Sequence, residues 1–114
     1  MLKIYHNPRC SKSRQTLALI EAAGEDKDII LYLDNPPKAA EIKTLLSQLG
    51  FESARQLMRK GEAIYKELGL KNIDDENALI KAMAEHPKLI ERPIVVKGET
   101  AILGRPPENV SALL

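Results

Sequence analysis

Hydrophobic and polar positions along the chain predict a β-α-β segment at the amino-terminal end. Residues 2–5 form a short apolar run that is followed by a turn signal, which predicts a strand. Residues 10–23 carry apolar side chains at helical spacing, and a glycine follows them. Residues 28–33 are a continuous apolar run rich in β-branched side chains, which suits a buried strand.

The middle of the chain is predicted to be helical, and its end returns to strands. Helical spacing and helix-ending residues mark four helices: Ile42–Leu49 ended by Gly50, a short one at Leu57 and Met58, residues 62–68, and one capped by Asp74 or Asp75 and ended before Pro87. Residues 94–96 and 100–103 then predict a β-hairpin. A short helix around Val110 closes the chain.

A β-α-β unit followed by a β-β-α unit is the order of the thioredoxin-like fold, a mixed-sheet α/β fold. The helices at about residues 38–90 would then be an insertion into that fold. No linker-like stretch isolates the insertion, so we expect residues 1–114 to form a single domain.

Composition narrows the classes of function. The net charge of +1 gives no electrostatic reason to expect a nucleic acid or an anionic membrane as partner. No apolar stretch approaches the ~18 residues that a membrane span needs, and we expect a cytoplasmic protein. The two histidines have no zinc-type spacing to the one cysteine, so no metal is expected.

Cys10 is the candidate nucleophile, and it lies where the first predicted strand passes into the first helix. The amides of a first helical turn favour a negative charge, so the pKa of the thiol should fall below that of a free cysteine. Arg9, Lys12 and Arg14 should act in the same direction through their positive charge. The polar neighbours do not suit an inert core cysteine. With no second cysteine, any redox chemistry must take its second thiol from another molecule.

Two neighbours of Cys10 have candidate supporting roles. Ser13 occupies the position of the second cysteine in a Cys-x-x-Cys motif, so the segment reads as the monothiol form of that motif. His6 lies four residues before Cys10. It either lowers the thiol pKa as an imidazolium or is a solvated histidine at a strand end, and spacing does not separate the two.

The segment from His6 to Arg14 resembles the active site of the glutaredoxin-dependent arsenate reductase (ArsC) family. The resemblance extends over nearly the whole chain, through Asn35-Pro36-Pro37, Leu57-Met58-Arg59-Lys60, Tyr65, Leu68-Gly69-Leu70, His86-Pro87, Leu89-Ile90, Arg92-Pro93-Ile94-Val95-Val96 and Gly104-Arg105-Pro106. The sequence departs from the family pattern at Ser11-Lys12, where many members have a pair of small residues. This lysine either strengthens oxyanion binding or marks a subgroup with another substrate.

The resemblance implies reduction of arsenate to arsenite through Cys10. It assigns the binding of the oxyanion to Arg59, Arg92 and Arg105, and guanidinium groups are suited to that task. From composition alone Arg55 would serve as well as Arg59. No cofactor is expected to stay bound. Glutathione is implied as co-substrate, and glutaredoxin as the protein that clears the mixed disulfide. The resemblance also implies a cis bond before Pro93.

Two other functions share the fold. A non-enzymatic regulator that binds RNA polymerase would use a Cys-x-x-Cys switch, and Ser13 removes that switch. A monothiol reductase of glutathionylated proteins would use Cys10 in the same way without binding arsenate. By contrast, the phosphatase-like arsenate reductases need Cys-x5-Arg and two further cysteines, and here Thr16 stands at the arginine position.

Overall fold

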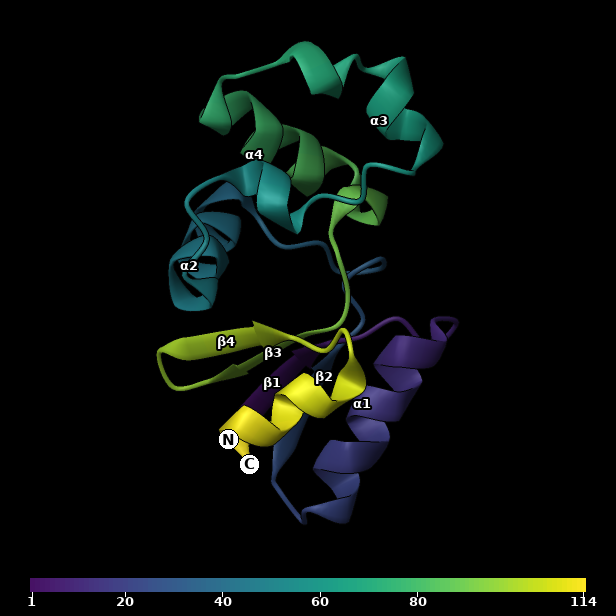
Figure 1. Ribbon diagram of the computed structural model, residues 1–114, viewed down its shortest axis with the longest axis vertical. Helices are drawn as coiled ribbons and strands as arrows, with labels where there is room; N and C mark the ends of the chain where they lie inside the picture. The colour runs from purple at the N-terminus through teal and green to yellow at the C-terminus, as the bar shows by residue number, and fades with distance from the viewer. The chain divides into compact units, whose positions relative to one another are not determined.

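The computed structural model describes residues 1–114, which fall into two units (Figure 1). Unit 1 consists of Met1–Asn35 and Arg92–Leu114, and unit 2 is the intervening Pro36–Glu91. The boundaries of unit 2 lie close to those of the predicted insertion. The expectation that the whole chain is one domain stays a prediction. No helix is long and apolar enough to cross a membrane.

Unit 1 contains a four-stranded mixed sheet in the order β2-β1-β3-β4. The strands are β1 (Leu2–Tyr5), β2 (Lys27–Ile30), β3 (Ile94–Lys97) and β4 (Thr100–Leu103). β2 runs parallel to β1, whereas β3 is antiparallel to both β1 and β4. The thioredoxin-like fold predicted from the order of elements is confirmed.

Two helices pack against each other and cover one face of the sheet in unit 1 (Figure 1). They are α1 (Ser11–Ala22) and the 3-10 helix η4 (Pro107–Leu113). Their apolar side chains meet alternate residues of the strands, as the two-residue period of a strand requires. The buried members of this core are Leu2, Ile4, Ile20, Val95 and Val110, with Leu17, Ile102 and Leu113 packed against them.

The second strand differs from its prediction, which was wrong in both length and burial. β2 ends at Ile30, because the carbonyl of Leu31 accepts the N–H groups of Asp34 and Asn35 in a turn. The strand also lies at the edge of the sheet, and Ile29 is 42% exposed. A continuous apolar run therefore does not distinguish a buried central strand from an edge strand that a turn cuts short.

Unit 2 is a set of short helices and single turns. The α-helices are α2 (Ala39–Leu49), α3 (Ala63–Glu67) and α4 (Glu76–Glu85), and the 3-10 helices are η1 (Ala54–Leu57), η2 (Leu70–Asn72) and η3 (Pro87–Leu89). α4 contacts α2, η1 and η3, and it provides much of the buried apolar surface. Met58, predicted to be helical, instead forms an antiparallel bridge with Ile90.

The ends of the helices in unit 2 follow from local sequence. Gly50 adopts a left-handed conformation (φ 74°) that ends α2, and Asp75 caps α4 by accepting the N–H of Asn77. Ser53 and Gln56 form a capping box at η1. Glu76 links this turn to α4, since its carboxylate accepts the N–H of Ala54 at 2.6 Å.

Candidate active site

Cys10 is the N-cap residue of α1, and its thiol is free and half-buried. Its backbone is extended, and its carbonyl accepts the N–H of Arg14 at 3.0 Å, which is the first bond of the helix. The side chain makes no capping bond to the helix. The sulfur atom therefore lies at the amino-terminal end of α1, as the sequence predicts.

The pKa of the Cys10 thiol is lower than that of an ordinary cysteine. Burial raises it, but this effect is outweighed by the N–H of Ser13, a hydrogen bond from the Arg92 side chain and the N–H of Lys12. The positive charge of Arg92 lowers it further. The main stabilisation thus comes from helix amides and from a distant arginine, and the basic residues next to Cys10 in the sequence are not its principal source.

The sheet register brings Arg92 and Arg105 to the sulfur atom. Arg92 precedes β3 and Arg105 follows β4, and the pairing of Ile94 with Leu103 puts both at the open end of the hairpin. β1 pairs antiparallel with β3, so the loop from β1 to Cys10 starts at that same end of the sheet. Nη1 of Arg105 lies 3.8 Å from Sγ of Cys10 and also donates to the carbonyl of Arg92 at 3.3 Å.

Both of these arginines precede a proline through a cis peptide bond. The bond before Pro93 was implied by the family resemblance, and it is confirmed. The bond before Pro106 was not predicted.

Ser13 and His6 form a buried polar network behind the thiol. Oγ of Ser13 lies 2.6 Å from Nδ1 of His6 and accepts the N–H of Asn7 at 3.0 Å. Ser13 is fully buried, and His6 is 6% exposed. The serine at the second position of the motif therefore fastens the loop before Cys10 to helix α1.

The state of His6 differs from both alternatives that its spacing left open. Its burial excludes a solvated histidine at a strand end. Burial also lowers the pKa of His6, as does the charge of Arg14, against a smaller raising effect of Glu21. An imidazole with a lowered pKa is neutral at pH 7, so His6 contributes a hydrogen bond to the loop and no positive charge to the thiol.

Arg14 also contributes to the loop. Its Nη1 donates to the carbonyl of Pro8 at 3.0 Å, which ties the first turn of α1 to the segment before Cys10.

Arg59 lies in unit 2, where two carboxylates hold it. Its Nη1 is 2.6 Å from Oε1 of Glu91, and its Nε is 3.6 Å from Oε2 of Glu62. Its backbone N–H donates to the carbonyl of Leu89 at 2.7 Å. The alternative residue, Arg55, is held by other groups of unit 2: it donates to the hydroxyl of Tyr65 and to the carbonyls of Leu70 and Ile73.

Residues 5–113 match the ArsC family. The chain belongs to the ArsC family. A protein of Neisseria meningitidis serogroup A named arsenate reductase is 50% identical over 114 residues, which cover 99% of this chain and 97% of the relative. Escherichia coli K12 has a relative described as uncharacterized protein YfgD, 54% identical over 96% of this chain and 92% of its own length. A solved structure described as arsenate reductase from Vibrio cholerae has a TM-score of 0.96 at 53% identity, and the match covers 99% of this chain and 97% of that one.

Gly104 lets this ArsC chain bring Arg105 close to α1. A Cβ atom at Gly104 would lie 2.4 Å from Oγ1 of Thr16 and 2.8 Å from Cγ of Pro93. Thr16 is fully buried, and its hydroxyl bonds to the carbonyl of Lys12 at 2.8 Å. In the sequence, Gly104 stands out only as part of the Gly104-Arg105-Pro106 motif. A glycine directly after a strand signals such a close backbone approach.

Asn109 holds the segment that carries Arg105, and sequence reasoning gave it no role. Its Nδ2 lies 3.2 Å from the carbonyl oxygens of both Leu103 and Arg105. One residue of η4 thus fixes the backbone on either side of Gly104. An asparagine in a short polar turn carries no sequence signal that would reveal these partners.

A cavity of about 390 Å³ opens beside the loop that leads to Cys10. Its walls combine a cation and a carboxylate with exposed apolar side chains, and they consist of His6, Asn7, Pro8, Arg9, Leu31, Leu33 and Asp34. A site of this size and mixed character suits a small polar molecule.

Proposed function

We propose that this protein reduces arsenate to arsenite through the thiolate of Cys10, with glutathione and glutaredoxin as the source of electrons. The observation that carries the proposal is the guanidinium of Arg105 at 3.8 Å from a half-buried sulfur whose pKa is lowered. A nucleophile and an oxyanion-binding group then lie together at a helix N-terminus. Relatives with half of their residues identical to this chain are named arsenate reductases, which supports the same substrate.

In the proposed site, Arg92 and Arg105 hold the oxygen atoms of arsenate and offset their charge. Arg59 is included because the family resemblance implies it, and its proposed role is the same. His6, Ser13 and Arg14 are positioning residues: their hydrogen bonds fix the loop that presents Cys10.

The proposed reaction has three steps. The thiolate attacks arsenic, a sulfur–arsenic bond forms, and one oxygen of arsenate takes up protons and leaves as water. A glutathione thiolate then attacks Sγ of Cys10. A disulfide forms, the sulfur–arsenic bond breaks, and its electron pair stays on arsenic, so As(V) becomes As(III). Finally a glutaredoxin thiolate takes over the glutathionyl group and releases the thiolate of Cys10. Because these donors are thiols, we place the reaction in the cytoplasm.

The test is arsenate-dependent oxidation of NADPH in a system coupled through glutathione reductase, with wild-type protein and Cys10→Ser. We expect turnover with wild type only when both glutathione and glutaredoxin are present, and none with Cys10→Ser, because the chain has no other thiol. Ser111→Ala, a change at an exposed position, is the matched control. A Cys10→Ser protein that still turns over at the wild-type rate would contradict the mechanism.

The same materials distinguish the alternative functions. If arsenate gives no oxidation of NADPH but a glutathionylated peptide does, the protein is a monothiol reductase. If neither substrate turns over and the chain binds RNA polymerase stably, it is a regulator.

A further inference from the structure

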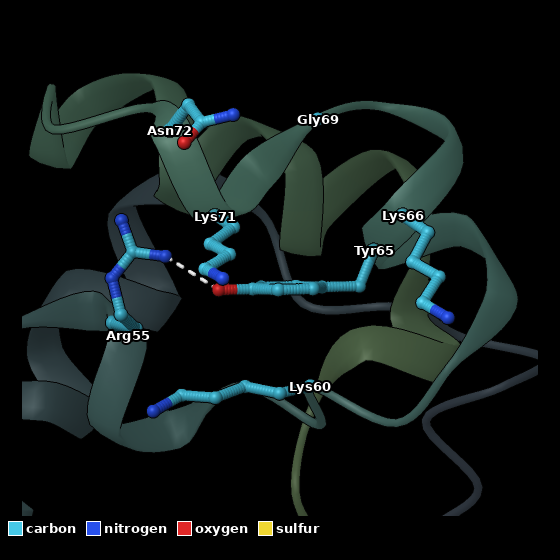
Figure 2. A pocket seen from close by; sticks show the side chains of 7 residues that line it. All are labelled: Arg55, Lys60, Tyr65, Lys66, Gly69, Lys71 and Asn72. Carbon is cyan, nitrogen blue, oxygen red and sulfur yellow. Dashed lines mark hydrogen bonds between the residues drawn. The ribbon is translucent and has the colours of Figure 1, made fainter.

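Unit 2 contains a cavity of about 550 Å³ whose charged lining residues are all cationic (Figure 2). The lining residues are Arg55, Lys60, Tyr65, Lys66, Gly69, Lys71 and Asn72. No carboxylate is among them. The volume falls within the range of roughly 300–1,000 Å³ that is usual for sites of small molecules.

Arg55 and Tyr65 form a fixed wall of this cavity. Nη1 of Arg55 donates to the Tyr65 hydroxyl at 2.6 Å and to the carbonyl of Leu70 at 3.0 Å, and Nη2 donates to the carbonyl of Ile73. Tyr65 is 5% exposed, so the cavity wall is held by hydrogen bonds and by packing. The wall is thus built before any ligand arrives.

The three lysines come from separate elements. Lys60 precedes α3, Lys66 lies within α3, and Lys71 lies in η2. In Figure 2, Lys71 and Lys60 lie on opposite sides of the Tyr65 ring, and Lys66 lies past the backbone end of that side chain. All three side chains are exposed, and none forms an ion pair.

The region around the cavity is more positively charged than the chain as a whole. Residues 55–72 carry five cationic side chains and only two carboxylates, Glu62 and Glu67, while the whole chain has a net charge of +1. Glu62 is engaged by Arg59, and Glu67 forms no ion pair with any of the three lysines. Like charges around one cavity repel each other, and a bound anion removes that repulsion.

We propose that this cavity binds an anion that carries two or more linked phosphate groups. Ammonium groups act as point charges that suit phosphate oxygens and need no fixed fork geometry. The three lysines lie around the Tyr65 side chain and not at one point, so two linked phosphate groups reach more of them than a single phosphate does. This site is separate from the proposed chemistry of Cys10 and does not depend on it.

The test is a calorimetric titration of the whole chain with pyrophosphate and, separately, with inorganic phosphate, at low ionic strength. We expect pyrophosphate to bind about tenfold more tightly than phosphate, because it engages an additional cation. Lys60→Ala combined with Lys71→Ala should weaken pyrophosphate binding by about tenfold or more, because these two lysines lie on either side of the Tyr65 ring. Added salt should weaken it as well, since the cations are exposed.

Two control variants test whether any loss of pyrophosphate binding is specific to the cavity. Lys43→Ala combined with Lys81→Ala removes the same charge from exposed positions of α2 and α4, outside the cavity, and should leave the affinity unchanged. Arg105→Ala should leave the response of the Tyr65 ring signals to pyrophosphate unchanged, which separates this cavity from the oxyanion site proposed beside Cys10. Perturbation of the Tyr65 ring signals by NMR during the titration locates the bound anion.

A third titration, with adenosine diphosphate, distinguishes the sources of the phosphate groups. Tighter binding than pyrophosphate supports an organic diphosphate, and equal binding supports an inorganic polyphosphate. The proposal is overturned if pyrophosphate does not bind, if it leaves the Tyr65 signals unperturbed, or if the Lys43 and Lys81 control weakens binding as much as the Lys60 and Lys71 variant.

Discussion

Arg55 in unit 2 and Arg105 in unit 1 have different surroundings and different expected roles. In unit 2, Arg55 is committed to the hydroxyl of Tyr65 and to two carbonyls. In unit 1, Arg105 is exposed, and one of its nitrogens lies 3.8 Å from a sulfur atom. Arg55 thus holds its own neighbours together, whereas Arg105 places a positive charge beside a nucleophile. Substitution of Arg105 should therefore act mainly on activity, and substitution of Arg55 mainly on stability.

The largest expected effect is that of Arg105→Ala on activity. Loss of a group that stabilises charge in the transition state typically lowers turnover by about 10²- to 10³-fold, and we expect kcat/KM for arsenate to fall by about 10²-fold. The free energy of unfolding should change by less than about 0.5 kcal/mol, because the side chain is exposed. Steady-state kinetics and urea unfolding measure the two quantities. Unchanged kinetics would remove Arg105 from the site, and Arg105→Lys should recover part of the loss by restoring the charge.

Next in size is Gly104→Ala, which tests how closely the Arg105 segment approaches α1. The added methyl group would meet Thr16 and the ring of Pro93, and overpacking of this kind costs about 1–3 kcal/mol. Activity should fall as well, because relief of the clash displaces Arg105. Gly61→Ala is the matched control, since a Cβ there meets nothing within 4 Å. Urea unfolding of both variants checks the difference, and equal stabilities would show that the approach is not tight.

The sequence predicted the fold because each element carries its own local signal. The Asp75 cap, the left-handed Gly50 and the hairpin strands all formed where their residues indicated. The apolar run at residues 28–33 led to a wrong prediction for β2. The turn at Leu31 depends on hydrogen bonds, and the edge position of β2 depends on its neighbours in the sheet, and an apolar run encodes neither.

The site was predictable only in part. The start of the helix at Cys10 is encoded by neighbouring residues, so its effect on the thiol pKa could be predicted from the sequence. Arg92 reaches Cys10, and Gly104 contacts Thr16, only because of the register of a hairpin that lies more than eighty residues after Cys10. No residue near Cys10 reveals that register. His6 was misjudged for a similar reason, because its burial and its bond to Ser13 arise only once α1 packs.

Arg55→Ala should produce the opposite outcome to Arg105→Ala. It leaves the hydroxyl of Tyr65 and the carbonyls of Leu70 and Ile73 without their donor. These groups are partly buried, so we expect a loss of about 1–2 kcal/mol in the free energy of unfolding. The kcat for arsenate should stay near that of wild type. Urea unfolding and the coupled assay test both, and a stable but inactive protein would contradict the contrast between the units.

The smallest expected effect is on the pH dependence of stability. It tests whether the imidazole of His6 that bonds to Ser13 in unit 1 is neutral. The pKa of His6 is lowered by folding, so the unfolded chain binds a proton there more readily than the folded chain. The neutral ring is therefore a source of stability above its unfolded pKa of about 6.5, and that contribution is lost as the pH falls below this value. We expect the free energy of unfolding to decrease between pH 7.5 and pH 5.5 by less in His6→Gln than in wild type.

Urea unfolding at the two pH values measures this difference, and His86→Gln provides a histidine control outside the network. Acid also protonates carboxylates throughout the chain, but that contribution is common to all three proteins and cancels in the comparison. If His6→Gln loses as much stability on acidification as wild type does, the imidazole is not held neutral by its burial. The loop before Cys10 would then contain a histidine whose charge changes between pH 5.5 and pH 7.5, while the bonds from Asn7 to Ser13 and from Arg14 to Pro8 would still hold it.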